Sequence, residues 1–111
     1  MQLFIIFLTE GEHVPQVMKE LYNNNYHGSV LSTKSIHNAF MDSVEPEPYF
    51  GGFSKMVDTV NVINRPMIFV VVKEDSEINN LSKIVNKSLD GIKGKGFMYS
   101  MPISFMEGLD D

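Results

Sequence analysis

The first hydrophobic run of the chain covers residues 2–9 (QLFIIFLT) and is apolar at both odd and even positions. A strand here would have two apolar faces, formed by Leu3, Ile5 and Phe7 on one side and Phe4, Ile6 and Leu8 on the other. Such a pattern is typical of a strand in the middle of a sheet that is covered on both sides. The sequence therefore predicts a central strand near the N-terminus.

Two later stretches have apolar residues at the spacing of one helix face. These residues are Val14, Val17, Met18 and Leu21 in the first stretch, and Ile78, Leu81, Val85 and Leu89 in the second. Thr9 and Glu12 have capping-box spacing before the first stretch, and Asp75 or Ser76 is placed to cap the second. Two amphipathic helices are predicted.

Three further segments, rich in β-branched and aromatic residues, predict strands at 28–34 (GSVLSTK), 66–73 (PMIFVVVK) and 97–103 (FMYSMPI). The order strand, helix, strand, strand, helix, strand predicts an α+β, ferredoxin-like βαββαβ sandwich. In this fold both helices cover one face of an antiparallel sheet. The 111 residues fit one domain over 1–111.

The second sheet face would then carry apolar side chains without a covering layer. An exposed apolar face of this size usually marks an interface. We therefore expect a homo-oligomer; ferredoxin-like domains that bury this face form closed rings, among which trimers are frequent.

The connection between the second and third strands, residues 35–64, is several times longer than a usual hairpin loop. Its first part, residues 35–48, is polar, acidic and interrupted by two prolines, so we expect it to be mobile. Its second part, residues 49–60 (YFGGFSKMVDTV), places Phe50, Phe53, Val57 and Val60 on one helical face. A short amphipathic helix is predicted there.

Composition narrows the classes of function. Nine Lys/Arg against fourteen Asp/Glu give a net charge of −5, which disfavours general nucleic-acid binding. The absence of cysteine excludes disulfides and thiolate chemistry and favours a reducing compartment. The N-terminal apolar run is shorter than a membrane span and lacks a basic flank, so we expect a cytoplasmic protein without membrane insertion.

Candidates for catalysis or metal binding are few. His13, His27 and His37 lie in three different segments and lack the spacing of a metal site. Ser and Thr residues after Gly28 have no base at motif spacing, and the carboxylates before Pro48 lie on a loop that does not fix a pair. We therefore expect no enzymatic activity and no metal site.

The loop at 91–96 (GIKGKG) combines three glycines with Lys93 and Lys95. Glycines allow backbone N–H groups to turn towards an anion, and the lysines supply positive charge. Glycine-lysine turns also serve simply to connect a helix to a strand, so both interpretations stay open.

Four segments together resemble the PII-like signalling superfamily. They are MQLFIIFL, NNNYHGSVLSTKS, NRPMIFVVVKEDSEINNLSKIV and GKGFMYSMPI, and the last is similar to the family's B-loop and final strand. The segment YFGGFSKMVDTV is similar to a compact helical T-loop of an atypical branch. The chain departs from the family pattern at Phe97, where a phosphate-binding lysine is usual, and in its acidic C-terminus, FMEGLDD.

The resemblance implies a homotrimer whose clefts between subunits bind a small effector, an adenine nucleotide or another small anion. Carried over by position, the ligand-binding residues are Gly28, Ser29, Val30, Lys34, Met67, Phe69, Gly94, Lys95 and Gly96. The long loop would contact a regulated transporter, enzyme or regulator through His37, Phe40, Tyr49, Phe50 and Phe53.

Two other functions fit the same pattern. A small ferredoxin-like enzyme, an isomerase or a monooxygenase, would need His27 or His37 in a closed apolar pocket. A structural interaction module would leave the cleft between subunits empty and uncharged.

Overall fold

The computed structural model describes residues 1–44 and 65–109. Within these ranges the elements follow the order β1 (Gln2–Leu8), the 3₁₀ turn η1 (Gly11–His13), α1 (Val14–Asn23), β2 (Gly28–Thr33), α2 (Ile36–Val44), β3 (Arg65–Val72), α4 (Glu77–Leu89) and β4 (Gly96–Pro102). All four predicted strands and both predicted amphipathic helices are present, with ends that differ by a few residues at most from those expected.

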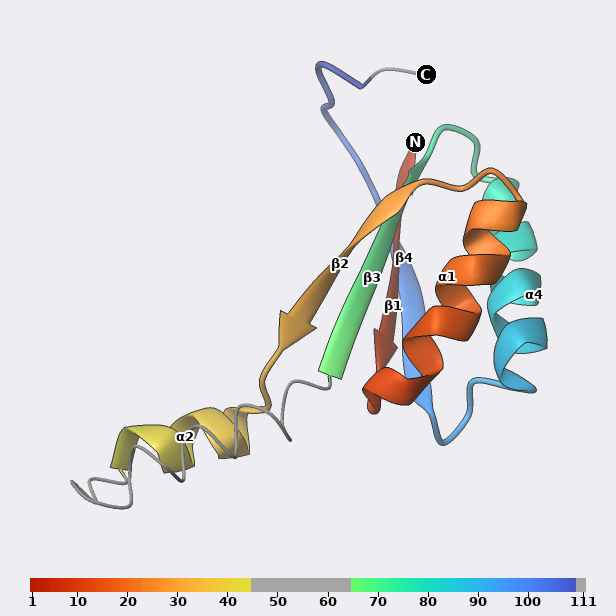
Figure 1. The fold of residues 1–111 in the computed structure, drawn as a ribbon. Helices are drawn as coiled ribbons and strands as arrows, with labels where there is room; N and C mark the ends of the chain where they lie inside the picture. The colour runs from red at the N-terminus through yellow and green to blue at the C-terminus, as the bar shows by residue number, and fades with distance from the viewer. Residues whose placement is uncertain (45–64, 110–111) are drawn as a thin grey trace.

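The four strands form one antiparallel sheet in the order β2-β3-β1-β4. Strand β1 lies between β3 and β4, as its two apolar faces predict. Helices α1 and α4 lie side by side on one face of the sheet (Figure 1). The architecture is therefore α+β with a four-stranded antiparallel sheet, and it is compatible with a ferredoxin-like fold.

The hydrophobic core fills the space between the sheet and the two helices. Phe4, Ile6 and Leu8 of β1 point into it, because alternate residues of a strand share one face. The helices and β3 contribute Val17, Leu21, Ile68, Val70, Val72, Leu81, Ile84, Val85 and Leu89. The predicted stripe of α4 is thus confirmed, whereas Met18 of α1 is 45% exposed and stays outside the core.

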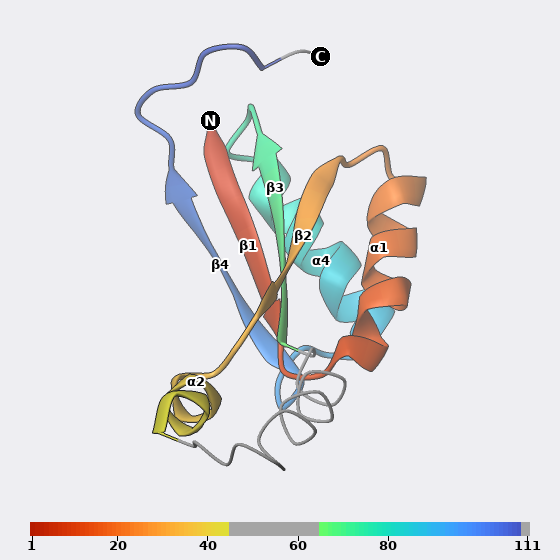
Figure 2. The same cartoon turned by 60° about the vertical axis from the view of Figure 1, so that its left-hand side comes forward.

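The opposite side of the sheet, which we call the open face, is apolar and has no helix over it in the described part of the chain (Figure 2). By strand register its apolar residues are Leu3, Ile5, Phe7, Leu31, Met67, Phe69, Val71, Phe97, Tyr99 and Met101, and Ser29, Thr33 and Arg65 lie on the same face near the β2 edge. Phe97 stacks between Phe7 and Tyr99, with ring centroids 5.0 and 5.9 Å apart. Tyr99 and Phe97 remain 43% and 53% exposed.

The segment after β2 differs from its prediction. Part of the stretch expected to be mobile forms the helix α2, which begins at Ile36. Ser35, the residue before it, caps the helix: its hydroxyl accepts a hydrogen bond from the backbone N–H of Asn38 at 3.1 Å, and its carbonyl oxygen accepts one from the backbone N–H of Ala39. The two prolines lie outside the described residues. The predicted helix at 49–60 lies outside the described residues.

The predicted capping box is also wrong. Thr9 does not cap a helix, because the 3₁₀ turn η1 comes before α1 and neither has a side-chain cap. The Thr9 backbone N–H and hydroxyl instead donate to the carbonyl oxygen of Lys95, at 3.0 and 3.1 Å. Thr9 thus ties the end of β1 to the start of β4.

Candidate functional site

The predicted ligand-binding residues separate into two groups at opposite ends of the sheet. Gly28, Ser29 and Val30 begin the edge strand β2, and Gly28 and Ser29 share with Phe69 the wall of a cavity of about 740 Å³. Lys34 follows the end of the same strand, where Thr33 pairs with Arg65. Met67 lies on the open face, in register between Leu31 and Phe7.

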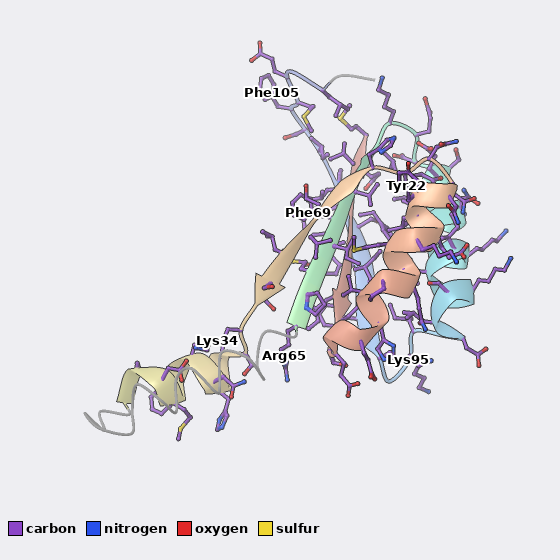
Figure 3. All side chains as sticks on the ribbon, in the orientation of Figure 1. Tyr22, Lys34, Arg65, Phe69, Lys95 and Phe105 are labelled. Atoms are coloured by element: carbon purple, nitrogen blue, oxygen red, sulfur yellow. The ribbon has the colours of Figure 1, made fainter. Side chains whose placement is uncertain are left out.

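Lys34 and the loop Gly94–Gly96 lie at the same end of the sheet but at its two opposite edges. Lys34 continues β2, and Gly96 begins β4, with β3 and β1 between them (Figure 3). Gly96 pairs with Leu8 at the end of β1, and Met67 pairs with Phe7 near the same end. One copy of the chain therefore does not bring Lys34 and Lys95 together.

The loop between α4 and β4 is held by its own hydrogen bonds. The backbone N–H groups of Lys95 and Gly96 both donate to the Ile92 carbonyl, at 2.8 and 3.2 Å, and Gly91 donates to Asn86. The Lys95 ammonium donates to the carbonyl oxygen of Leu89, at the C-terminal end of α4, where a positive charge is favourable. Lys93 is exposed and is the more accessible cation of this loop.

Lys34 forms an ion pair with Asp42 of α2, between the ammonium Nζ and the carboxylate Oδ2. The two side chains are 45% and 26% exposed. Of the predicted partner-binding residues, His37 and Phe40 lie on α2 and are exposed, and Ile36 and Met41 are exposed beside them. Tyr49, Phe50 and Phe53 lie outside the described residues.

A second cavity, of about 200 Å³, lies between α1 and β2. Its wall includes Met18, Tyr22, Tyr26, His27 and Val30. His27 is exposed, as is His37, so neither histidine lies in the closed pocket that the enzyme alternative requires. Asn80 donates a hydrogen bond to the Tyr26 hydroxyl at 2.9 Å, which joins this wall to α4.

One cluster was not predicted from the sequence. Glu10, Glu12 and His13 place their polar atoms within 4.8 Å of one another around η1, where the side chain of His13 lies 3.8 Å from that of Glu12. A hydrogen bond with Glu12, together with its negative charge, raises the pKa of Glu10. The spacing Glu-x-Glu-His was the only available sequence signal, and Glu10 and Glu12 are both exposed.

Comparison with known proteins identifies no family for this chain: no protein-family model matches it, and a search of curated proteins found no match. The PII-like resemblance therefore stays a prediction. Among the helices that the structure describes, none has both the length and the apolar composition needed to cross a membrane.

Proposed function

We propose that this chain is a non-catalytic, PII-like regulatory protein with a ferredoxin-like βαββαβ fold. It assembles as a homotrimer, binds a small anionic effector between its subunits and controls a partner protein through residues 35–64. The observation that carries the proposal is the open face, an apolar surface that spans all four strands while the opposite face is covered by the chain's own helices. Exposed apolar surfaces of this extent mark sites of association.

The separation of the predicted ligand residues supports a site between subunits. Lys34 at the β2 edge is a predicted ligand residue, and Lys93 is the exposed lysine of the loop that contains the predicted residue Lys95, near the β4 edge. Lys34 and Lys93 lie at the same end of the sheet, too far apart in strand order for one small ligand. When copies associate around the open face, the β2 edge of one copy meets the β4 edge of its neighbour. The two positive charges then line one cleft, which suits an anion.

The surface of α2 supports a role in partner binding. This helix leads away from the sheet on the side opposite α1 and α4 (Figure 1). It presents Ile36, which is 88% exposed, together with Phe40 and Met41. Apolar residues at helical spacing are the anchors by which an amphipathic helix enters a groove of another protein.

Assembly is tested by sedimentation of the wild type and of two matched variants. Phe69→Glu puts a charge in the centre of the open face, and Tyr22→Glu puts the same charge on the exposed surface of α1. We expect a trimer for the wild type and Tyr22→Glu, and a monomer for Phe69→Glu, because burying an unpaired carboxylate is costly. A monomeric wild type at micromolar concentration would contradict the proposal.

The effector is tested by thermal shift with adenine nucleotides, cyclic dinucleotides and bicarbonate. A ligand of the cleft should raise the melting temperature of the wild type, because it binds only the folded state. Lys34→Ala should remove that shift, and Lys83→Ala on the exposed side of α4 should leave it unchanged. No shift with any of these ligands would leave the structural interaction module as the better hypothesis.

A further inference from the structure

The ion pair between Lys34 and Asp42 joins the end of β2 to the second turn of α2. Within residues 1–44 and 65–109, the elements that pack extensively are the neighbouring strands, the pair α1 and α4, and the pair α1 and η1. Helix α2 packs extensively against none of these elements. The hydrogen bonds of Ser35 fix only the start of the helix. In the described part of the chain, the ion pair is therefore the main tie between the body of α2 and the sheet.

Asp42 also neutralises the cation that the proposed effector needs. A phosphate group placed on the Lys34 ammonium would lie within a few ångströms of the Asp42 carboxylate, where like charges repel. Lysine carries one charge, so it cannot fully compensate both anions. Each contact therefore weakens the other.

We propose that Asp42 acts as a built-in competitor of a phosphate-bearing effector: α2 is held on Lys34 when the effector is absent and is released when the effector binds. This inference rests on the proposed function, since it concerns the same cleft. The two equilibria are linked. The bound effector lowers the equilibrium constant for docking of α2 on Lys34 by the same factor by which the docked Asp42 lowers the affinity for the effector. Release of α2 from Lys34 changes the position of the exposed residues Ile36, Phe40 and Met41, and so changes the apolar surface that is presented to a partner protein.

Titration calorimetry with ATP and with inorganic pyrophosphate tests the competition. Asp42→Asn should bind two- to fivefold more tightly than wild type, a factor that corresponds to the contribution of an exposed ion pair. Glu107→Gln removes one negative charge from the exposed C-terminal segment and is the control for net charge. Asp42→Glu retains the carboxylate and should restore weaker binding, whereas Lys34→Ala should abolish binding.

The position of α2 gives a second, independent readout. The chain contains no cysteine, so Ala39→Cys introduces a single site for a fluorescent label on the exposed side of α2. Saturating ATP should lower the anisotropy of this label in the wild-type background. Asp42→Asn and Lys34→Ala should each lower it without ATP, although they change ATP affinity in opposite directions.

The outcomes separate the two proposals. If ATP or pyrophosphate binds to a trimer, but Asp42→Asn binds no more tightly than Glu107→Gln or the anisotropy is unchanged, the competitor role is wrong and the proposed function stands. If neither anion binds to wild type or to Asp42→Asn, the competitor role is wrong and the effector part of the proposed function loses its phosphate ligands.

Discussion

The two faces of the sheet differ in what covers them, although both are apolar. Ile6 and Ile5 are successive residues of β1, and they are 0% and 5% exposed. Ile6 is covered by helices of its own chain, whereas among residues 1–44 and 65–109 Ile5 has no helix over it and lies between its neighbours on the open face, which include Phe69 and Tyr99. Burial of a single side chain therefore does not show that a whole sheet face is covered. Large neighbouring side chains can shield a central residue from solvent while they remain exposed themselves.

The largest expected effect separates these two isoleucines. Ile6→Ala should lower the free energy of unfolding by about 2–5 kcal/mol, since it leaves a cavity between sheet and helices. This loss should be the same at every protein concentration. Ile5→Ala should cost less in dilute solution and more as copies associate, and urea denaturation over a hundredfold range of concentration measures both.

Equal losses at both positions, independent of concentration, would contradict this distinction between the faces. They would mean that the open face is already buried within one copy of the chain.

The next effect concerns the pairing that places Phe97 and Tyr99 on the open face. A Cβ atom at Gly96 would collide with the backbone carbonyl of Phe7, so Gly96→Ala must push β4 away from β1, at a cost of about 1–3 kcal/mol. Gly94→Ala is the matched control: it has open space but a φ of +85°, and should cost about 1 kcal/mol of backbone strain. Thermal unfolding of both variants measures the difference.

A smaller effect is expected for the aromatic stack itself. Phe97→Leu retains an apolar side chain but removes the ring contacts with Phe7 and Tyr99, which should weaken assembly by about 1 kcal/mol. Phe105→Leu, in the exposed C-terminal segment, should leave assembly unchanged. Sedimentation equilibrium compares the two, and an equal effect of both substitutions would argue against the stack as part of the interface.

The smallest effect lies away from both faces, at Glu10. Its pKa is raised because the protonated form is favoured by the hydrogen bond with Glu12 and by the charge of Glu12. A carboxyl group whose folded-state pKa is raised contributes stability at low pH, and this contribution is lost as the pH rises through that pKa. Glu12→Gln should therefore lower the pKa of Glu10 and reduce the change in the free energy of unfolding as the pH rises through that pKa. A carbon-detected NMR titration of Glu10 measures the pKa.

The regular elements could be predicted because their side-chain periodicity directly reflects burial. The continuous apolar run of β1 and the stripe Leu81, Val85 and Leu89 in α4 identify these two elements, and the stripe also identifies the buried positions of α4. Helix α2 was not predicted, because Pro46, Pro48 and the acidic residues around them favour an irregular, mobile segment. Ile36, Phe40 and Val44 nevertheless have helical spacing, and Ser35 is a favourable capping residue.

The candidate site was predictable only in part. Sequence similarity selects Lys34 and Lys95 alike, but only the structure shows that Asp42 pairs with the first and that the second closes the C-terminal end of α4. Both contacts depend on the path of a turn, which hydrophobic periodicity does not encode. The glycine-lysine pattern of this loop predicts Lys93 and Lys95 equally as cations for an anion, and the family resemblance selects Lys95, whereas the structure shows that Lys93 is the exposed one.

The central position of β1 has a consequence for how the protein folds during synthesis. Its first residues pair with the last residues of β4, as Gln2 does with Pro102, and its other neighbour is β3. Among the four strands of this sheet, the first to be synthesised is thus the one whose partners are synthesised last, so β1 stays unpaired, with its apolar side chains, until β3 and β4 follow. Contacts this distant in sequence slow folding and expose the incomplete chain to aggregation through β1.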